Sequence, residues 1–169
     1  MLYLGIIAGI FIVEFIIKTI VEKRAKWDST KALLGGKILL KKHHNKGFML
    51  NILEKRQKVV AIISLFLCLF LSGVVILSGG KYNKLIKLGL SVILGGAYSN
   101  TYDRLFRKYV VDYVSLGVKN TKLRKVVFNL ADFCIMIGTI LVILGGISHE
   151  NIGEGQICGE SDGGFGSSQ

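Results

Sequence analysis

Residues 59–77 form an uncharged apolar run that is long enough for a helix to cross the hydrocarbon core of a membrane. Three more apolar runs of similar length occupy residues 2–21, 85–102 and 126–147. We therefore predict an all-α membrane protein, a bundle of four transmembrane helices with both termini on the same side. The run at 2–21 lacks a basic leading segment and a clear small-residue cleavage site, so we interpret it as a retained span.

The composition supports a membrane protein and disfavours other classes. Hydrophobic residues make up 51% of the 169 positions, proline is absent, and the formal net charge is nevertheless +11. Basic segments beside apolar runs suit contact with anionic lipid headgroups. Nucleic-acid binding is disfavoured because the charges flank the apolar runs instead of lining one face. Cys68 and Cys134 lie inside apolar runs and Cys158 near the end of the chain, so no disulfide framework is indicated.

The polar, basic segment at 22–58 predicts a small β-like element between the first two helices. Two short strand-like runs, KILL at 37–40 and FMLNIL at 48–53, flank HHNKG, and Gly35-Gly36 indicates a turn. We interpret His43 and His44 as solvated loop residues, not as a metal site, and Trp27 as an interfacial anchor.

The two ends of the chain differ in character. Residues 1–147 contain all four predicted spans and form one predicted domain. Residues 148–169 are rich in glycine, serine and acidic residues, which is typical of a disordered tail.

Carboxylates lie inside or beside apolar segments between residues 95 and 132. Asn100 precedes Asp103 and Arg104 by three and four residues, Asn129 precedes Asp132 by three, and Asp112 lies in an apolar run. On a helix, these spacings place each set on one face. Buried carboxylates are costly in a membrane and are functional candidates by default. Three uses remain open: aspartyl peptide hydrolysis, a proton or cation relay, and helix caps with ion pairs. Asp103 followed by Arg104 indicates a satisfied charge pair.

The first apolar run contains Glu14 and Lys18, which are four residues apart and share a helix face. They could form an ion pair near the membrane surface, with Lys18 reaching toward water. They could equally support a site within the bundle.

Three motifs in order, GGAYSNTYDR, VVDYV and FNLAD, resemble the signature of the lipoprotein signal peptidase (signal peptidase II) family. Two upstream positions resemble it less closely: Glu14 to Lys18, where the family has Asp-x-x-x-Lys, and Asn45-Lys46-Gly47, where it has Asn-x-Gly. The chain departs from the family pattern at Glu14, at Phe48-Met49, and at Val127, where a proline is common. The resemblance extends from residue 2 to about 147.

The resemblance implies a membrane aspartyl endopeptidase that removes the signal peptide from diacylglyceryl-modified prolipoproteins, cutting before the lipidated cysteine. By motif position, Asp112 and Asp132 would be the catalytic pair. Supporting and substrate-binding roles would fall to the remaining motif residues, which are Glu14, Lys18, Asn45, Gly47, Asn100, Asp103, Arg104 and Asn129. No metal or other cofactor is expected, because a carboxyl pair supplies both base and acid. The alternative is a non-enzymatic membrane bundle or an ion-translocating relative of the same fold.

The expected location is the cytoplasmic membrane of a bacterium, with the active site on the extracytoplasmic side. The charge distribution argues against this orientation, because residues 23–58 carry eleven lysines and arginines and basic loops usually stay in the cytoplasm. We follow the family here, because the lipidated substrate presents its cleavage site on the outer face. We expect a monomer that contacts membrane lipids.

Overall fold

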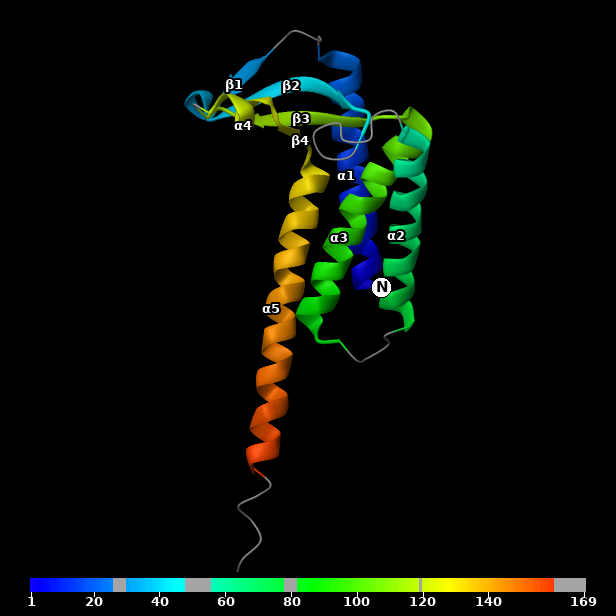
Figure 1. The fold of residues 1–169 in the computed structure, drawn as a ribbon, viewed down its shortest axis with the longest axis vertical. Helices are drawn as coiled ribbons and strands as arrows, with labels where there is room; N and C mark the ends of the chain where they lie inside the picture. The colour runs from blue at the N-terminus through cyan, green and yellow to red at the C-terminus, as the bar shows by residue number, and fades with distance from the viewer. Residues whose placement is uncertain (26–29, 48–55, 78–81, 119, 160–169) are drawn as a thin grey trace, which may run out of the picture.

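A computed structural model describes residues 1–25, 30–47, 56–77, 82–118 and 120–159, and shows a mostly helical protein with one small antiparallel sheet (Figure 1). The elements follow in this order: α1 (Leu2–Arg24), β1 (Lys31–Leu33), η1 (Leu34–Gly36), β2 (Ile38–Asn45), α2 (Gln57–Leu77), α3 (Lys84–Tyr102), η4 (Asp103–Arg107), β3 (Val110–Leu116), α4 (Thr121–Lys125), β4 (Val127–Phe128) and α5 (Leu130–Gly159).

Three helices in the described part of the chain are long and apolar enough to cross a membrane: Leu2–Arg24, Gln57–Leu77 and Leu130–Ser148. They correspond to three of the four predicted spans. Few residues of these helices are buried inside the protein, and large apolar side chains such as Ile62, Phe66 and Phe70 of α2 are exposed. Outward-facing apolar side chains are what a helix bordered by lipid requires.

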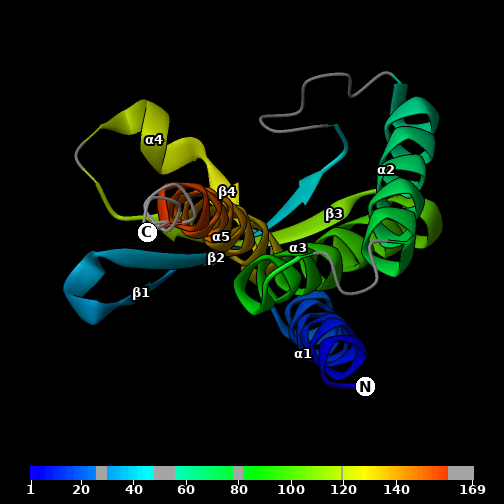
Figure 2. The same cartoon turned by 90° about the horizontal axis from the view of Figure 1, so that it is seen from below.

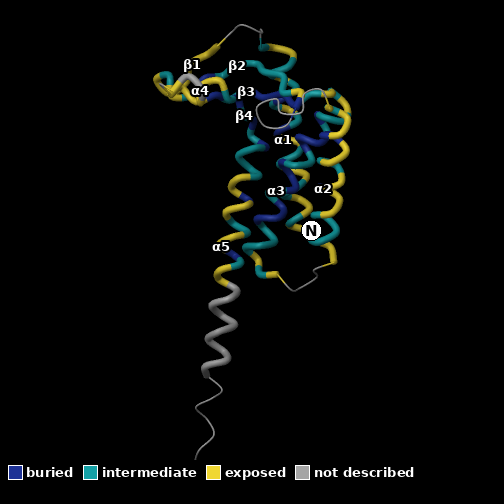
Figure 3. Tube along the Cα trace, in the orientation of Figure 1, coloured by how far each residue is buried: buried dark blue, intermediate teal, exposed yellow. Residues whose placement is uncertain are grey.

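The helix α3 covers the fourth predicted stretch, but it is more polar than the other three. It packs against α1, α2 and α5, and Figure 3 shows buried positions along it and where the helices meet the sheet. Because α3 is enclosed by other helices, its polar side chains can be sequestered from lipid.

Glycines bring α3 close to its neighbours. A Cβ atom on Gly96 would lie 2.6 Å from the carbonyl oxygen of Ala131 in α5, and one on Gly95 would lie 2.8 Å from Cβ of Ile10 in α1. A Cβ on Gly89 would likewise lie 2.6 Å from the carbonyl oxygen of Gly138. Small residues are thus required where these backbones touch.

The sheet lies across one end of the helices, with strand order β1-β2-β3-β4 (Figures 1 and 2). Every pairing is antiparallel; β2 and β3 align His43 with Asp112 and Asn45 with Val110. Two strands come from the chain between α1 and α2, and two from the chain between α3 and α5. The sheet is therefore larger than the element predicted between the first two helices.

The predicted β-like element at 22–58 is only partly correct. The run at 37–40 contributes to β2, and Gly35 and Gly36 form a turn with φ of 66° and 88°. His43 and His44, however, belong to β2 and not to a loop. The reason is β3, a strand from the distant VVDYV segment, which supplies β2 with a partner that local sequence does not reveal. The run at 48–53 and Trp27 lie outside the described residues.

At the other end of the chain, α5 continues past Ile147, where the last predicted span ends, to Gly159. Residues 148–159, for which the composition predicted disorder, are therefore helical. No proline occurs anywhere in the chain to stop the helix. Residues 160–169 lie outside the described part.

Candidate active site

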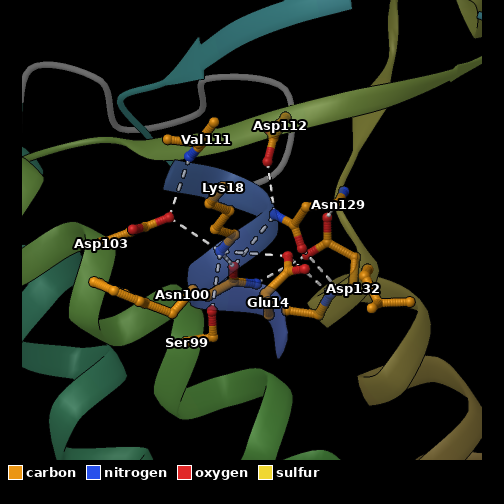
Figure 4. A network of polar contacts seen from close by, with 12 residues as sticks. Glu14, Lys18, Ser99, Asn100, Asp103, Val111, Asp112, Asn129 and Asp132 are labelled. Carbon is orange, nitrogen blue, oxygen red and sulfur yellow. Dashed lines mark hydrogen bonds and ion pairs between the residues drawn. The ribbon is translucent and has the colours of Figure 1, made fainter. Parts of the chain in front are cut away.

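Polar side chains gather at the junction of α1, α3 and α5 with the underside of β3 (Figure 4). Most of them are fully or almost fully buried, and they are joined by hydrogen bonds and ion pairs. Figure 4 labels Glu14, Lys18, Ser99, Asn100, Asp103, Val111, Asp112, Asn129 and Asp132. Every acidic and basic residue in this set was singled out from the sequence.

Asp112 and Asp132 come from different elements and are linked through two asparagines. Asp112 lies on β3 and is 2% exposed, whereas Asp132 lies in the first turn of α5 and is half-buried. Asn129 Nδ2 donates to Asp112 Oδ1 (2.7 Å) and to Asn100 Oδ1 (3.2 Å), and Asn100 Nδ2 donates to Asp132 Oδ1 (3.0 Å). The two carboxylates are thus the ends of one hydrogen-bonded chain.

Asn129 is the residue that places both carboxylates. Strand β4 pairs with β3, which delivers Asn129 beside Asp112 at the start of α5. The Asp132 backbone N–H donates to Asn129 Oδ1, and the Asn129 backbone N–H donates to Asp132 Oδ2, both at 3.0 Å. This reciprocal capping box explains the Asn-x-x-Asp spacing. It also fixes the Asn129 amide, because Oδ1 must face the backbone donor and Nδ2 must face Asp112.

Lys18 fixes the second amide in the same way. Its ammonium group, which can only donate, lies 2.7 Å from Asn100 Oδ1, 3.0 Å from Asp103 Oδ2 and 3.3 Å from Ser99 Oγ. Because Oδ1 of Asn100 faces this cation, Nδ2 must face Asp132. Lys18 is fully buried, so the alternative in which it reaches toward water is wrong.

The glycine pair of the first motif has a matching role. Gly95 and Gly96 bring α3 against α1 and α5, and Ser99 and Asn100 lie four residues later on the same faces. Ser99 therefore meets Lys18 of α1, and Asn100 meets Asp132 of α5. The GG-x-x-S-N spacing is explained by close helix contacts one turn away from the polar contacts.

Asp103 has further partners besides Arg104, with which it interacts electrostatically. It pairs with Lys18 and, at 3.3 Å, with Arg107, and its Oδ2 accepts the backbone N–H of Val111 (3.2 Å). Arg104 donates to the carbonyl oxygen of Asn100 (3.2 Å). The sequence analysis missed Arg107, although its position four residues after Asp103 was a usable signal.

Glu14 reaches two groups at the start of α5. Its Oε1 accepts the backbone N–H of Ala131 (3.2 Å), and its Oε2 accepts the hydroxyl of Tyr113 (2.8 Å). Lys18 lies 3.6 Å from Glu14 Oε1. The carboxylate also stands at a helix N-terminus, where negative charge is stabilised.

Asn45 reaches the site from the end of β2, and Gly47 follows it two residues later. The Gly47 backbone N–H donates to Asn45 Oδ1 (3.1 Å), which turns the Asn45 amide so that it hydrogen-bonds to the Asp112 carboxylate. Gly47 is buried. Asn45 thus contacts Asp112 directly, and Gly47 holds the Asn45 amide in place.

The surroundings favour the protonated form of Asp112. Burial, and then the negative charge of Asp132, raise the pKa of Asp112 to about 7, although hydrogen bonds from Asn129 and Asn45 and the charge of Lys18 act in the opposite direction. Arg104 interacts electrostatically with both aspartates.

The positive and negative charges of the site are equal in number when one of its carboxyl groups is protonated. Among its described residues are four carboxylates and three cations, namely Glu14, Asp103, Asp112 and Asp132 against Lys18, Arg104 and Arg107. One proton on the aspartate pair leaves three charges of each sign. The site can therefore present one protonated and one ionised carboxyl group, which together can donate and accept protons.

A second polar cluster lies at the end of α1, outside this site. Glu22 pairs with Lys42 (2.9 Å) and with His44 Nε2 (2.8 Å), and the His44 ring stacks on Tyr109 with centroids 3.7 Å apart. Within the described residues, no group of three His, Cys, Asp or Glu side chains could hold a metal ion.

Comparisons with known proteins identify relatives of this chain. The family described as "Signal peptidase (SPase) II" matches residues 6–147. A lipoprotein signal peptidase of Caldicellulosiruptor bescii is 37% identical over 142 residues, covering 84% of this chain and 88% of that protein.

Two solved structures share the fold. A bacterial membrane enzyme determined by the in meso method at 2.3 Å resolution has a TM-score of 0.76 and 21% identity, and covers 99% of this chain and 94% of its own. A second, at 1.9 Å resolution, has a TM-score of 0.73 and 23% identity, with coverage of 84% and 90%.

Proposed function

Because this chain belongs to the signal peptidase II family and is a lipoprotein signal peptidase, we propose that Asp112 and Asp132 are its catalytic dyad. The observation that carries the proposal is the continuous chain from Asp112 through Asn129 and Asn100 to Asp132. Each asparagine is fixed so that its N–H groups point to a carboxylate. The arrangement holds two acids from different elements in one place.

The environments of the two carboxyl groups support a different role for each. Asp112 is the more buried, and its raised pKa makes it the acid, which donates a proton to the oxygen of the scissile carbonyl. Asp132 is more accessible and acts as the base, which takes a proton from the attacking water. When the tetrahedral intermediate collapses, the proton on Asp132 passes to the leaving amine. Asp112 then regains its proton from the new product, and the dyad holds one proton again.

The other motif residues orient this pair and offer contacts to substrate. Lys18, Asn100 and Asn129 set the positions of the two carboxylates. Asn45 contacts Asp112 from the end of β2 and is held by Gly47, which supports a role for this segment beside the substrate backbone. The substrate proposed for this site is a diacylglyceryl-modified prolipoprotein, cut before the lipidated cysteine.

The chain is a bacterial membrane protein, and we extend this to four spans by adding α3. Nineteen residues of helix extend about 29 Å, close to the thickness of a bilayer core of about 30 Å. The enclosure of α3 by other helices supports a span that tolerates polar residues. In this arrangement residues 1–147 form the peptidase domain, and the sheet with the dyad faces the extracytoplasmic side. The enzyme acts as a monomer surrounded by lipid.

Orientation can be tested by thiol labelling in a background where Cys68, Cys134 and Cys158 are replaced by alanine. Lys31→Cys, in the exposed β1, should react with a membrane-impermeant reagent in intact cells. Tyr82→Cys, in the exposed turn at the opposite end of the helices, should react only after permeabilisation. The reverse pattern would place the basic sheet in the cytoplasm.

The activity is tested with the purified protein and a diacylglyceryl-modified prolipoprotein, followed by mass spectrometry of the products. The expected result is one cut directly before the lipidated cysteine. Asp112→Asn and Asp132→Asn should abolish it, whereas Glu22→Gln removes a carboxylate outside the site and should not. Full cleavage by both aspartate variants would overturn the dyad.

A further inference from the structure

The hydroxyl of Tyr113 lies between β3, which carries Asp112, and the start of α5, which carries Asp132. It donates to Glu14 Oε2 (2.8 Å) and accepts the backbone N–H of Leu130 (3.1 Å). Tyr113 directly follows Asp112 on β3, and Leu130 precedes Asp132 by two residues. One oxygen atom therefore ties the backbone beside one carboxylate to the backbone beside the other.

The first turn of α5 shows why this contact matters. The N–H groups at a helix start have no partner within the helix, and lipid offers no water to satisfy them. Here the N–H of Leu130 is accepted by Tyr113, that of Ala131 by Glu14, and that of Asp132 by Asn129. Three consecutive donors are thus held by side chains from β3, from α1 and from the cap itself.

Glu14 links Tyr113 to the start of α5, because it accepts hydrogen bonds from both Tyr113 and Ala131 and is fully buried. Burial, the Glu14 charge and the hydrogen bond to Glu14 raise the pKa of Tyr113, so its hydroxyl stays protonated and remains a donor. A phenylalanine ring could fill the same space, but it could neither accept from Leu130 nor donate to Glu14.

We infer that Tyr113, held by Glu14, is a positioning residue that sets the separation of Asp112 and Asp132. The inference rests on the proposed dyad and extends it to a residue that touches neither carboxylate. Without the hydroxyl, the start of α5 loses its fixed link to β3, and Asp132 can move away from Asp112. A small displacement of reacting groups is enough to lower kcat strongly.

The test is Tyr113→Phe in the reconstituted enzyme, with Tyr109→Phe as the matched control. Tyr109 is the neighbouring tyrosine on the same segment, and its hydroxyl lies 3.5 Å from Glu22, away from the dyad. Tyr113→Phe should lower kcat roughly tenfold or more with little change in KM. It should also move the alkaline limb of the pH profile of kcat to lower pH, because a more distant Asp132 raises the pKa of Asp112 less. Tyr109→Phe should do neither.

Glu14→Gln provides a second route to the same conclusion. If the hydroxyl acts together with Glu14, the double variant should lose less activity than the product of the two single losses. This variant also carries the test if Tyr113→Phe does not fold, since it should then show the same fall in kcat and the same shift of the alkaline limb.

An unchanged kcat and an unchanged alkaline limb of its pH profile in a folded Tyr113→Phe protein would overturn the inference. So would a loss confined to KM or to the yield of folded protein. Failure of the dyad itself is distinguishable, because Asp112→Asn and Asp132→Asn would then remain active in the same assay.

Discussion

Two clusters of charged residues lie one helical turn apart on α1, and they differ in their contact with solvent. Lys18 with Glu14 and Asp103 is almost completely buried, the side chains being 0–2% exposed. Glu22 with Lys42 and His44 lies at the end of the helix, where the Glu22 side chain is 28% exposed. The distances in the two clusters are similar, so geometry alone does not distinguish them.

The difference lies in what removing one partner would leave behind. A charge that loses its partner in a buried site stays desolvated, whereas one near the surface is hydrated again. The Lys18 cluster therefore has to be complete, and it orients Asn100 toward a proposed catalytic residue. The Glu22 cluster attaches β2 to α1. Its Lys42 side chain is 6% exposed, but its carboxylate keeps contact with solvent and stays hydrated when Lys42 is removed. The following predictions test this contrast, from the largest effect to the smallest.

The largest effect is expected from Asp112→Asn and Asp132→Asn. Each variant keeps its size but can no longer exchange a proton, and general acid–base catalysis contributes roughly 10²–10⁴-fold. The measurement is kcat on the lipidated prolipoprotein, with binding of uncut substrate as a second readout. Each variant should bind substrate without cutting it. Cleavage within a few fold of the wild-type rate would contradict the assignment.

The second largest effect is expected from Lys18→Met, which should lower both stability and activity. Removing one member of a buried ion network costs roughly 3–5 kcal/mol, because Glu14 and Asp103 stay buried with less compensation. The free energy of unfolding can be measured in mixed detergent micelles. Lys42→Met removes the corresponding lysine of the other cluster and should cost less than about 1 kcal/mol. Equal losses in the two variants would show that burial does not set the difference.

The pH dependence of kcat should report on Asp112 and not on Glu22. Asp112 has a pKa raised to about 7, so it keeps its proton below that pH and loses it above. Activity that needs this proton should therefore fall as pH rises above about 7, by about tenfold per pH unit. Glu22→Gln should leave this limb where it is. A profile that stays flat well above pH 7 would exclude Asp112 as the acid.

The smallest effect is expected from Glu22→Gln. The change removes a carboxylate that is 28% exposed and should alter the free energy of unfolding by less than about 1 kcal/mol. Its effect should shrink further at high salt, because accessible ion pairs are screened. A loss as large as that of Lys18→Met, independent of salt, would mean that the two clusters are equivalent.

The sequence was most informative where single residues have strong physical consequences. The uncharged run at 59–77 predicted a span, and carboxylates inside apolar segments predicted functional candidates. The spacing of charged residues singled out every acidic and basic residue shown in Figure 4, and the family resemblance assigned them to one site.

It failed where the answer depends on partners far away in the chain. Strand β2 could not be extended through His43 and His44 without knowing that β3 pairs with it. The more polar composition of α3 could not be understood without its enclosure by α1, α2 and α5. Tyr113 gave no local signal, because its role depends on Glu14, 99 residues earlier.

The two asparagines that link Asp112 to Asp132 also prevent direct proton transfer along that link. An amide N–H can donate a hydrogen bond but does not release its proton, so neither Asn129 nor Asn100 can pass a proton from one aspartate to the other. The two aspartates therefore influence each other electrostatically, but they cannot exchange a proton through the asparagines. A proton that moves between the two aspartates therefore needs another route, such as water or the bound substrate. In the proposed reaction the substrate supplies that route, because Asp112 and Asp132 exchange their protons with it and not with each other.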